Sequence, residues 1–69
     1  MNKVYGSYKA YIEALKAEFI GKPVMYEGKR YTITDVDYNG MILIDKPAEY
    51  TWTTAVYEPH EARKALINE

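Results

Sequence analysis

Residues 24–44 read VMYEGKRYTITDVDYNGMILI, which contains three short apolar runs separated by two turn signals. Glu27-Gly28-Lys29 is a turn of the kind that joins two antiparallel strands. Asn39-Gly40 is the strongest hairpin signal in the chain, and it predicts a two-residue I′ turn with both central residues at positive φ. The stretch therefore predicts three antiparallel strands joined by two hairpins.

The middle strand, expected over residues 31–38, does not alternate regularly. Ile33 and Val36 are both apolar enough to be buried, but a strict period of two places them on opposite faces of a sheet. An inserted residue would bring them back to one face. We therefore predict a bulge or sharp bend near Thr34 and Asp35.

An amphipathic helix is predicted over residues 4–20, before these strands. Its apolar positions recur at alternating spacings of three and four, which lays one stripe along a helix. The stripe consists of Tyr5, Tyr8, Ile12, Leu15 and Phe19. Ser7 is the expected N-cap and Gly21 the expected left-handed residue after the helix. We expect most of the stripe to pack on the sheet, although its spacing also suits a dimer seam.

One further strand and a second helix complete the prediction. The third strand, residues 41–44, is apolar on both faces and should be central. Residues 51–57 are rich in Thr and aromatics, which predicts a fourth strand. Pro59 suits the first turn of a helix over residues 60–68. The expected fold is α+β: one domain, residues 1–69, in which four short strands form a small SH3-like barrel or a curled sheet and the first helix covers its open side. The alternative is an open four-stranded sheet with both helices on one face.

Composition excludes several classes of function. The 69 residues include nine basic and ten acidic side chains, for a net charge of −1, so no overall field attracts nucleic acid or an anionic membrane. No apolar run approaches the roughly 18 residues of a membrane span, and we expect a cytoplasmic protein. Because the sequence has no cysteine, the core or self-association must supply the stability of so short a chain. A homo-oligomer is one way to do so.

Aromatic side chains are unusually frequent. Eight tyrosines, one tryptophan and one phenylalanine are more than a core of this size can hide, and Tyr and Trp are enriched at protein interfaces. Large rings next to Pro47 and at the exposed end of the first helix are the best candidates for contact with a partner. The predicted protein-binding residues are Tyr50, Trp52, Tyr57, Tyr5 and Tyr8.

The residues available for catalysis are few. His60 is the only histidine and Ser7 the only serine, so neither a Ser-His-acid nor a Cys-His nucleophile system is favoured. Residues 35–40 spell D-x-D-x-N-G, the opening of an EF-hand calcium loop, but Lys46 stands where that loop needs its closing Glu. A hairpin explains the Asn-Gly pair without a metal. We therefore expect no enzymatic activity, no cofactor and no metal site.

A second interpretation is a module that binds single-stranded nucleic acid. Lys22, Lys29 and Arg30 lie near Tyr26 and Tyr31 in the sequence, which combines positive charge with rings that can stack on bases. The acidic total opposes this interpretation, since affinity for nucleic acid depends largely on positive charge. Turn lysines also serve simply to keep a strand edge soluble.

The strand region also resembles a known group of proteins. The stretch from Gly21 to Val56, which reads GKPVMYEGKRYTITDVDYNG at its start and carries LIDK at 43–46 and TTAV at 53–56, is similar to small uncharacterised proteins of bacteriophages and prophages of Gram-positive bacteria. The resemblance covers about half of the chain and contains no chemical motif. It implies a phage context, in which small accessory proteins bind a host or phage macromolecule. The leading hypothesis is thus a non-enzymatic accessory protein that binds a host or defence factor in the host cytoplasm.

Overall fold

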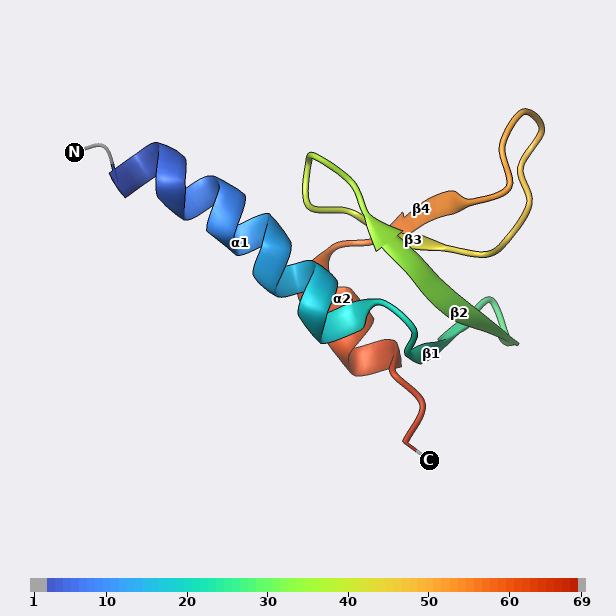
Figure 1. Cartoon of the computed structure of the whole chain (residues 1–69). Helices are drawn as coiled ribbons and strands as arrows, with labels where there is room; N and C mark the ends of the chain where they lie inside the picture. The colour runs from blue at the N-terminus through green and yellow to red at the C-terminus, as the bar shows by residue number, and fades with distance from the viewer. Residues whose placement is uncertain (1–2, 69) are drawn as a thin grey trace.

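The chain folds as a helix, a four-stranded antiparallel meander and a second helix, as its sequence predicts (Figure 1). The computed structural model describes the backbone of residues 3–68 and the side chains of residues 8–68. The elements are α1 (Lys3–Phe19), β1 (Pro23–Tyr26), β2 (Lys29–Val36), β3 (Ile42–Ile44), β4 (Thr54–Tyr57) and α2 (Pro59–Ala65). The strands lie in the order β1-β2-β3-β4, so β3 is central as expected.

Strand β2 contains the predicted bulge. Its pairing with β3 shifts register between Ile33 and Asp35. Beyond the shift, Val36 lies opposite Ile42, just as Ile33 lies opposite Ile44. Since alternate residues of β3 share a face, the bulge places both apolar residues of β2 on the buried face of the sheet.

Both helices pack against this one face. The buried core consists of Ile12, Leu15, Phe19, Val24, Ile33, Val36, Ile42, Ile44 and Ala62. The helices also contact each other, because the Arg63 guanidinium of α2 donates to both carboxylate oxygens of Glu18 on α1, at 2.6 and 2.8 Å. The same guanidinium lies 5.5 Å from the centre of the Phe19 ring. Among residues 8–68, the α1 side chains of this core all belong to the C-terminal half of the helix. The N-terminal half of the helix extends past the sheet (Figure 1).

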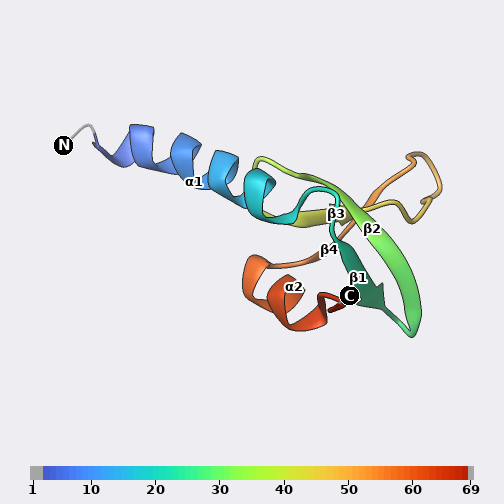
Figure 2. The same cartoon turned by 60° about the horizontal axis from the view of Figure 1, so that its bottom comes forward.

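The sheet is curled but does not close into a barrel. Its two edge strands are bridged by the Tyr57 hydroxyl of β4, which donates to the carbonyl of Met25 in β1 at 2.6 Å. Residues after α2 run along the outer edge of β1, where Leu66 bridges to Val24 and the amide of Ile67 donates to the carbonyl of Pro23 at 3.0 Å. Figure 2 shows α2 and the C-terminus next to β1. Of the two predicted forms, the curled sheet is therefore correct, because α2 and the tail occupy the edge that β4 would need to pair with.

The I′ geometry predicted for the second hairpin is found in the first. Glu27 and Gly28 both have positive φ, 51° and 79°, so the first hairpin has the I′ geometry. The predicted I′ turn at Asn39-Gly40 is wrong, since of that pair only Gly40 has positive φ, at 87°. Instead, the amide of Gly40 donates to the carbonyl of Asp37 at 2.9 Å, and the Asp37 carboxylate accepts the amides of residues 39 and 41 at 2.8 and 3.0 Å. This side chain stabilises a wider loop.

Several predicted boundaries also change, three of them for reasons that the structure shows. Ser7 lies inside α1 rather than at its N-cap, because the helix already begins at Lys3. The strand expected from residue 51 begins only at Thr54, because the carbonyl of Thr51 is used within the preceding loop, where it accepts the amide of Ala48. The second helix ends at Ala65 because the next residues turn to pair with β1. Within residues 3–68, neither helix is long and apolar enough to cross a bilayer.

Candidate functional site

The loop between β3 and β4, residues 45–53, carries the two most exposed large rings among the described residues, and we call it the aromatic loop. Its base is held by hydrogen bonds. The Asp45 carboxylate accepts the amide of Thr32 at 3.0 Å, and the Thr54 hydroxyl donates to the carbonyl of Lys46 at 2.7 Å. Within the loop, the Thr51 hydroxyl donates to the carbonyl of residue 53 at 2.6 Å. These bonds tie the loop to two strands at its base.

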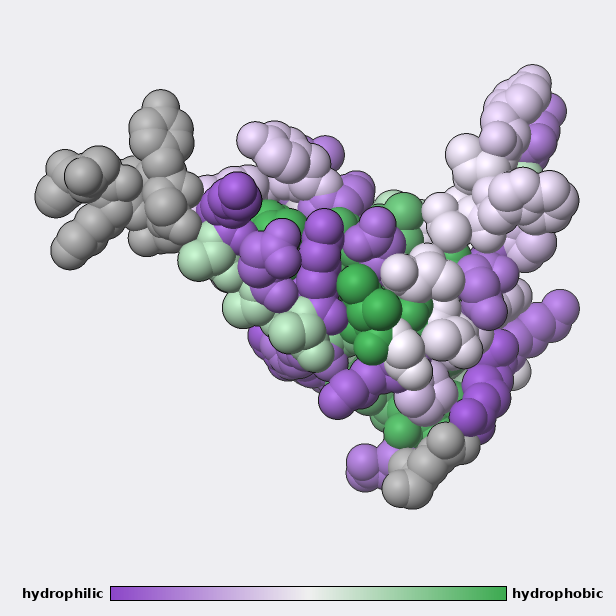
Figure 3. All heavy atoms as spheres, viewed as in Figure 1, coloured by the Kyte–Doolittle hydropathy of each residue, from purple (hydrophilic) through white to green (hydrophobic). Residues whose placement is uncertain are grey.

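Tyr50 and Trp52 point away from the core. Their exposed fractions are 88% and 83%, and the loop that carries them projects from the sheet at the upper right of Figures 1 and 3. Together with Ala48, Glu49 and Thr51, the two rings border a shallow recess of about 180 Å³. The site therefore offers apolar ring surface beside one carboxylate, which is chemistry for contact with a partner.

Tyr57, the third predicted ring of this surface, lies elsewhere. Its ring packs edge-on against Tyr26, with 5.7 Å between ring centres, and its hydroxyl binds the carbonyl of Met25. Burial raises the pKa of this hydroxyl, and the nearby Tyr26 and Glu61 raise it further. The structure therefore gives Tyr57 a position between the two edges of the sheet, apart from Tyr50 and Trp52.

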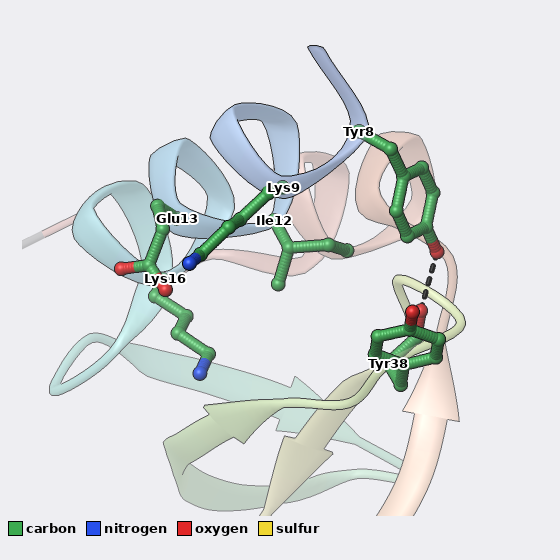
Figure 4. Close-up of a pocket in the computed structure, with 6 residues that line it drawn as sticks. All are labelled: Tyr8, Lys9, Ile12, Glu13, Lys16 and Tyr38. Atoms are coloured by element: carbon green, nitrogen blue, oxygen red, sulfur yellow. Dashed lines mark hydrogen bonds between the residues drawn. The ribbon is translucent and has the colours of Figure 1, made fainter. Parts of the chain in front are cut away.

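A second recess lies between α1 and the loop that joins β2 to β3. It measures about 300 Å³ and is lined by Tyr8, Lys9, Ile12, Glu13, Lys16 and Tyr38 (Figure 4). The Tyr8 hydroxyl donates to the carbonyl of Tyr38, and the two rings meet edge-on at 5.9 Å. Lys16 pairs with Asp35 at 3.9 Å on the same side. Of the two predicted helix residues, Tyr8 thus belongs to this recess, while the side chain of Tyr5 lies outside the described residues.

Sequence reasoning missed Tyr38, which is 81% exposed. The available signal was its position in a turn between Asp37 and Asn39, because a large ring at a hairpin tip has no strand neighbour to cover it. Gly40 belongs to the same loop and lies under α1, where a Cβ atom would come within 4.0 Å of Tyr11 and Ile12. The recess thus depends on close contact between helix and loop.

The residues of the nucleic-acid interpretation do not form one strip. Lys22 precedes β1 while Lys29 follows it, so the four residues of the strand, at about 3.3 Å each, separate the two charges. Arg30 is exposed beside Lys29. The rings of Tyr26 and Tyr31 lie 6.3 Å apart and pack against the core. The two rings therefore pack against the core, whereas the three basic side chains are exposed.

The acidic residues of the D-x-D-x-N-G motif already have partners within the protein. Asp37 caps its own turn through two backbone amides, and Asp35 accepts the amide of Val36 at 2.8 Å. In the described part of the chain, no three His, Asp or Glu side chains gather closely enough to hold a metal ion. The turn is thus accounted for by its own hydrogen bonds.

One pair of charged groups, Arg63 and Glu18, links the two helices. The hydrogen bond from Arg63 lowers the pKa of the Glu18 carboxyl, and the charges of Arg63 and Lys22 lower it further. Both side chains are substantially exposed, so the pair fixes α2 against α1 and offers no buried acid or base for catalysis.

Comparison with known protein families, with curated proteins and with solved structures finds no match to this chain.

Proposed function

We propose that this chain is a non-enzymatic binding protein that docks on another protein through the aromatic loop, with Trp52 and Tyr50 as its anchors. The observation that carries the proposal is the exposure of both rings, 83% and 88%, on a loop that is hydrogen-bonded at its base. A ring on a loop that is already positioned loses little conformational freedom on binding. Anchors of this kind supply most of the energy of an interface.

The size of the rings suits a small but specific interface. Tyr and Trp each bury roughly 150–250 Å² when they are covered, so the two rings bring about 300–500 Å² to the contact. A standard interface buries about 800 Å² on each partner. The aromatic loop can therefore supply about half of one side, and its polar neighbours supply the rim.

The charge of the loop limits which partners suit it. Glu49 borders the recess between the rings, and Asp45 lies at the base of the loop. A complementary partner would present an apolar pocket with a Lys or Arg at its margin, since like charges at an interface disfavour the wrong partners. The resemblance to small phage and prophage proteins supports a host or defence factor as that partner.

A role without catalysis is supported by the distribution of reactive groups. The single histidine, His60, is exposed on α2 with its Nδ1 atom 3.7 Å from a carboxylate oxygen of Glu58, and the single serine lies in α1. A nucleophile and its base must come within hydrogen-bond reach of each other. The chain's candidate groups lie on different elements, which supports binding as its activity.

Affinity capture from the native host, followed by binding measurements on the purified pair, tests the proposal. The bait is the intact chain, and the captured protein is identified by mass spectrometry and titrated by calorimetry. We expect Trp52→Ala and Tyr50→Ala each to weaken binding by about tenfold or more, the effect of about 1.4 kcal/mol at an anchor residue.

Tyr38→Ala is the matched control, because it removes an equally exposed ring from another loop. It should leave the affinity unchanged. Unchanged affinity in both aromatic-loop variants, with their folds intact by circular dichroism, would rule the surface out. Retardation of single-stranded DNA at low salt, lost on Lys29→Glu, would favour the nucleic-acid function instead.

A further inference from the structure

The two edges of the sheet differ in whether other parts of the chain cover them. The outer edge of β1 is covered, because the carbonyls of Pro23 and Met25 accept the amide of Ile67 and the hydroxyl of Tyr57, and Leu66 bridges to Val24. Strand β4 is the other edge. Among the described residues, no backbone group on the side of β4 that faces away from β3 has a backbone hydrogen-bond partner. That edge can therefore accept another strand.

The sequence around β4 lacks the charged side chains and prolines that often protect an open edge. Residues 50–57 read YTWTTAVY, eight residues without a charge, a proline or a glycine. Exposed edges are normally blunted by Lys, Pro or inward-pointing charges. The register shift in the β3–β4 pairing falls opposite Val56, and a bulge twists the strand locally. The regular part of the edge therefore centres on Thr54 and Ala55.

We propose that the β4 edge pairs with the β4 edge of a second copy of this chain, antiparallel across a twofold axis, to form a continuous eight-stranded sheet. The neutral strand is compatible with its own copy, because no like charges would oppose each other across the axis. A twofold contact uses the same patch on both copies, which is the commonest symmetry of soluble oligomers. The inference goes beyond the proposed function, because it concerns the backbone edge rather than the rings.

The geometry also explains why large rings stand next to the open edge. Trp52 and Tyr50 directly precede β4 in the chain, so in an antiparallel dimer each pair of rings flanks the end of the partner's strand. Four rings at about 150–250 Å² each contribute roughly 600–1,000 Å², and the strand pair adds its own area. The total is near the lower limit for a specific interface, so the dimer should be weak and its population should depend on concentration.

Sedimentation velocity on the full chain, from micromolar to millimolar concentration, measures the dimer. We expect reversible dimerisation of the wild type, and hydrogen exchange at residues 54–57 that slows as the concentration rises. Ala55 is exposed, so Ala55→Lys should leave the fold intact and weaken dimerisation by about tenfold or more through repulsion across the axis. Ala55→Glu should do the same, and an equimolar mixture of the two variants should dimerise again.

Ala14→Lys is the matched control, since Ala14 is also an exposed alanine and lies on α1, and this variant should dimerise like the wild type. A wild type that stays monomeric at millimolar concentration would overturn the inference. So would an Ala55→Lys variant that dimerises normally, a mixture that stays monomeric, or a dimer without protection at residues 54–57. Each of these results leaves the proposed function standing if capture of a different protein still depends on Trp52.

Discussion

At the β1 side of the sheet, the rings of Tyr26 and Tyr57 pack edge-on, and the Tyr57 hydroxyl binds a backbone carbonyl of the edge strand. In the loop that leads into β4, Tyr50 and Trp52 are almost fully exposed and the strand that follows has an open edge. The same kinds of side chain thus stabilise the fold in one region and face solvent in the other. The difference is whether a second element, here α2 and the tail after it, lies close enough to cover the edge.

This comparison separates two kinds of substitution. Changes in the covered region should cost stability, because they remove contacts within the chain. Changes in the aromatic loop should cost binding and leave stability nearly constant, because those rings have few contacts within the chain to lose.

The largest effect is expected from Phe19→Ala. Phe19 is fully buried between the helices and the sheet, and removal of a buried Phe side chain costs about 3–5 kcal/mol. A chain of this length has a total stability of roughly 3–10 kcal/mol, so the variant should be largely unfolded or close to it. Urea denaturation followed by circular dichroism measures the change, and Phe19→Leu should lose much less. A midpoint equal to that of the wild type would show that the core lies elsewhere.

A moderate effect is expected from Tyr57→Phe, which removes only the hydroxyl that joins β4 to β1. One such hydrogen bond contributes about 0.5–1.5 kcal/mol, and the loss should appear in the urea midpoint at neutral pH. Because the pKa of this hydroxyl is raised in the fold, its contribution is complete below the ordinary Tyr pKa of 10.0 and is lost as pH rises through the higher folded value. The wild type should therefore lose its stability advantage over the Tyr57→Phe variant at strongly alkaline pH. A constant difference at all pH values would contradict the assignment.

A smaller effect is expected from Glu18→Gln, measured as thermal stability against pH. The pKa of Glu18 is lowered in the fold, first by its hydrogen bond with Arg63. A carboxyl of this kind stabilises the fold above its ordinary pKa of 4.5, and that contribution is lost as pH falls through the lower folded value. Glu18→Gln should remove this part of the loss of stability in acid. The thermal stabilities of the variant and the wild type should therefore be most similar at the lowest pH. Since the side chains of Glu18 and Arg63 are both substantially exposed, added salt should also reduce the difference in thermal stability between the wild type and the variant.

The smallest effect on stability is expected from Trp52→Ala. Its ring is 83% exposed, and a surface substitution away from packed features usually changes stability by no more than about 0.5 kcal/mol. Differential scanning calorimetry of a dilute sample, in which self-association is negligible, measures the change. A loss above about 1 kcal/mol would show that the ring packs within its own chain, and the contrast between the two regions would then fail.

Much of the fold could be predicted because it depends on local rules. The buried residues Ile12, Leu15 and Phe19 of the predicted α1 stripe and the position of the bulge in β2 follow from side-chain periodicity, and both are confirmed. The turn at Asn39-Gly40 could not be predicted correctly, because an aspartate two residues before Asn39 accepts the backbone amides and selects a wider loop. Competition of that kind is decided by small energy differences that dipeptide preferences do not contain.

The candidate surface was only partly accessible from the sequence. Tyr50, Trp52 and Tyr57 are close in the chain and similar in chemistry, yet the first two are exposed and the third packs against Tyr26. Tyr38, by contrast, was not identified and is exposed beside Tyr8. Aromatic content shows that rings must reach the surface, but it does not say which ones.

The sequence by itself determined the order of the elements, the buried stripe of α1 and the inserted residue of β2, because periodicity and turn residues act between neighbours in the chain. Only the tertiary structure decided which edge of the sheet is covered and which tyrosines are buried. These outcomes depend on where α2 and the tail after it come to rest against strands about 40 residues earlier in the chain. Contacts over such a distance are set by the packing of the whole core, which no local pattern of residues contains.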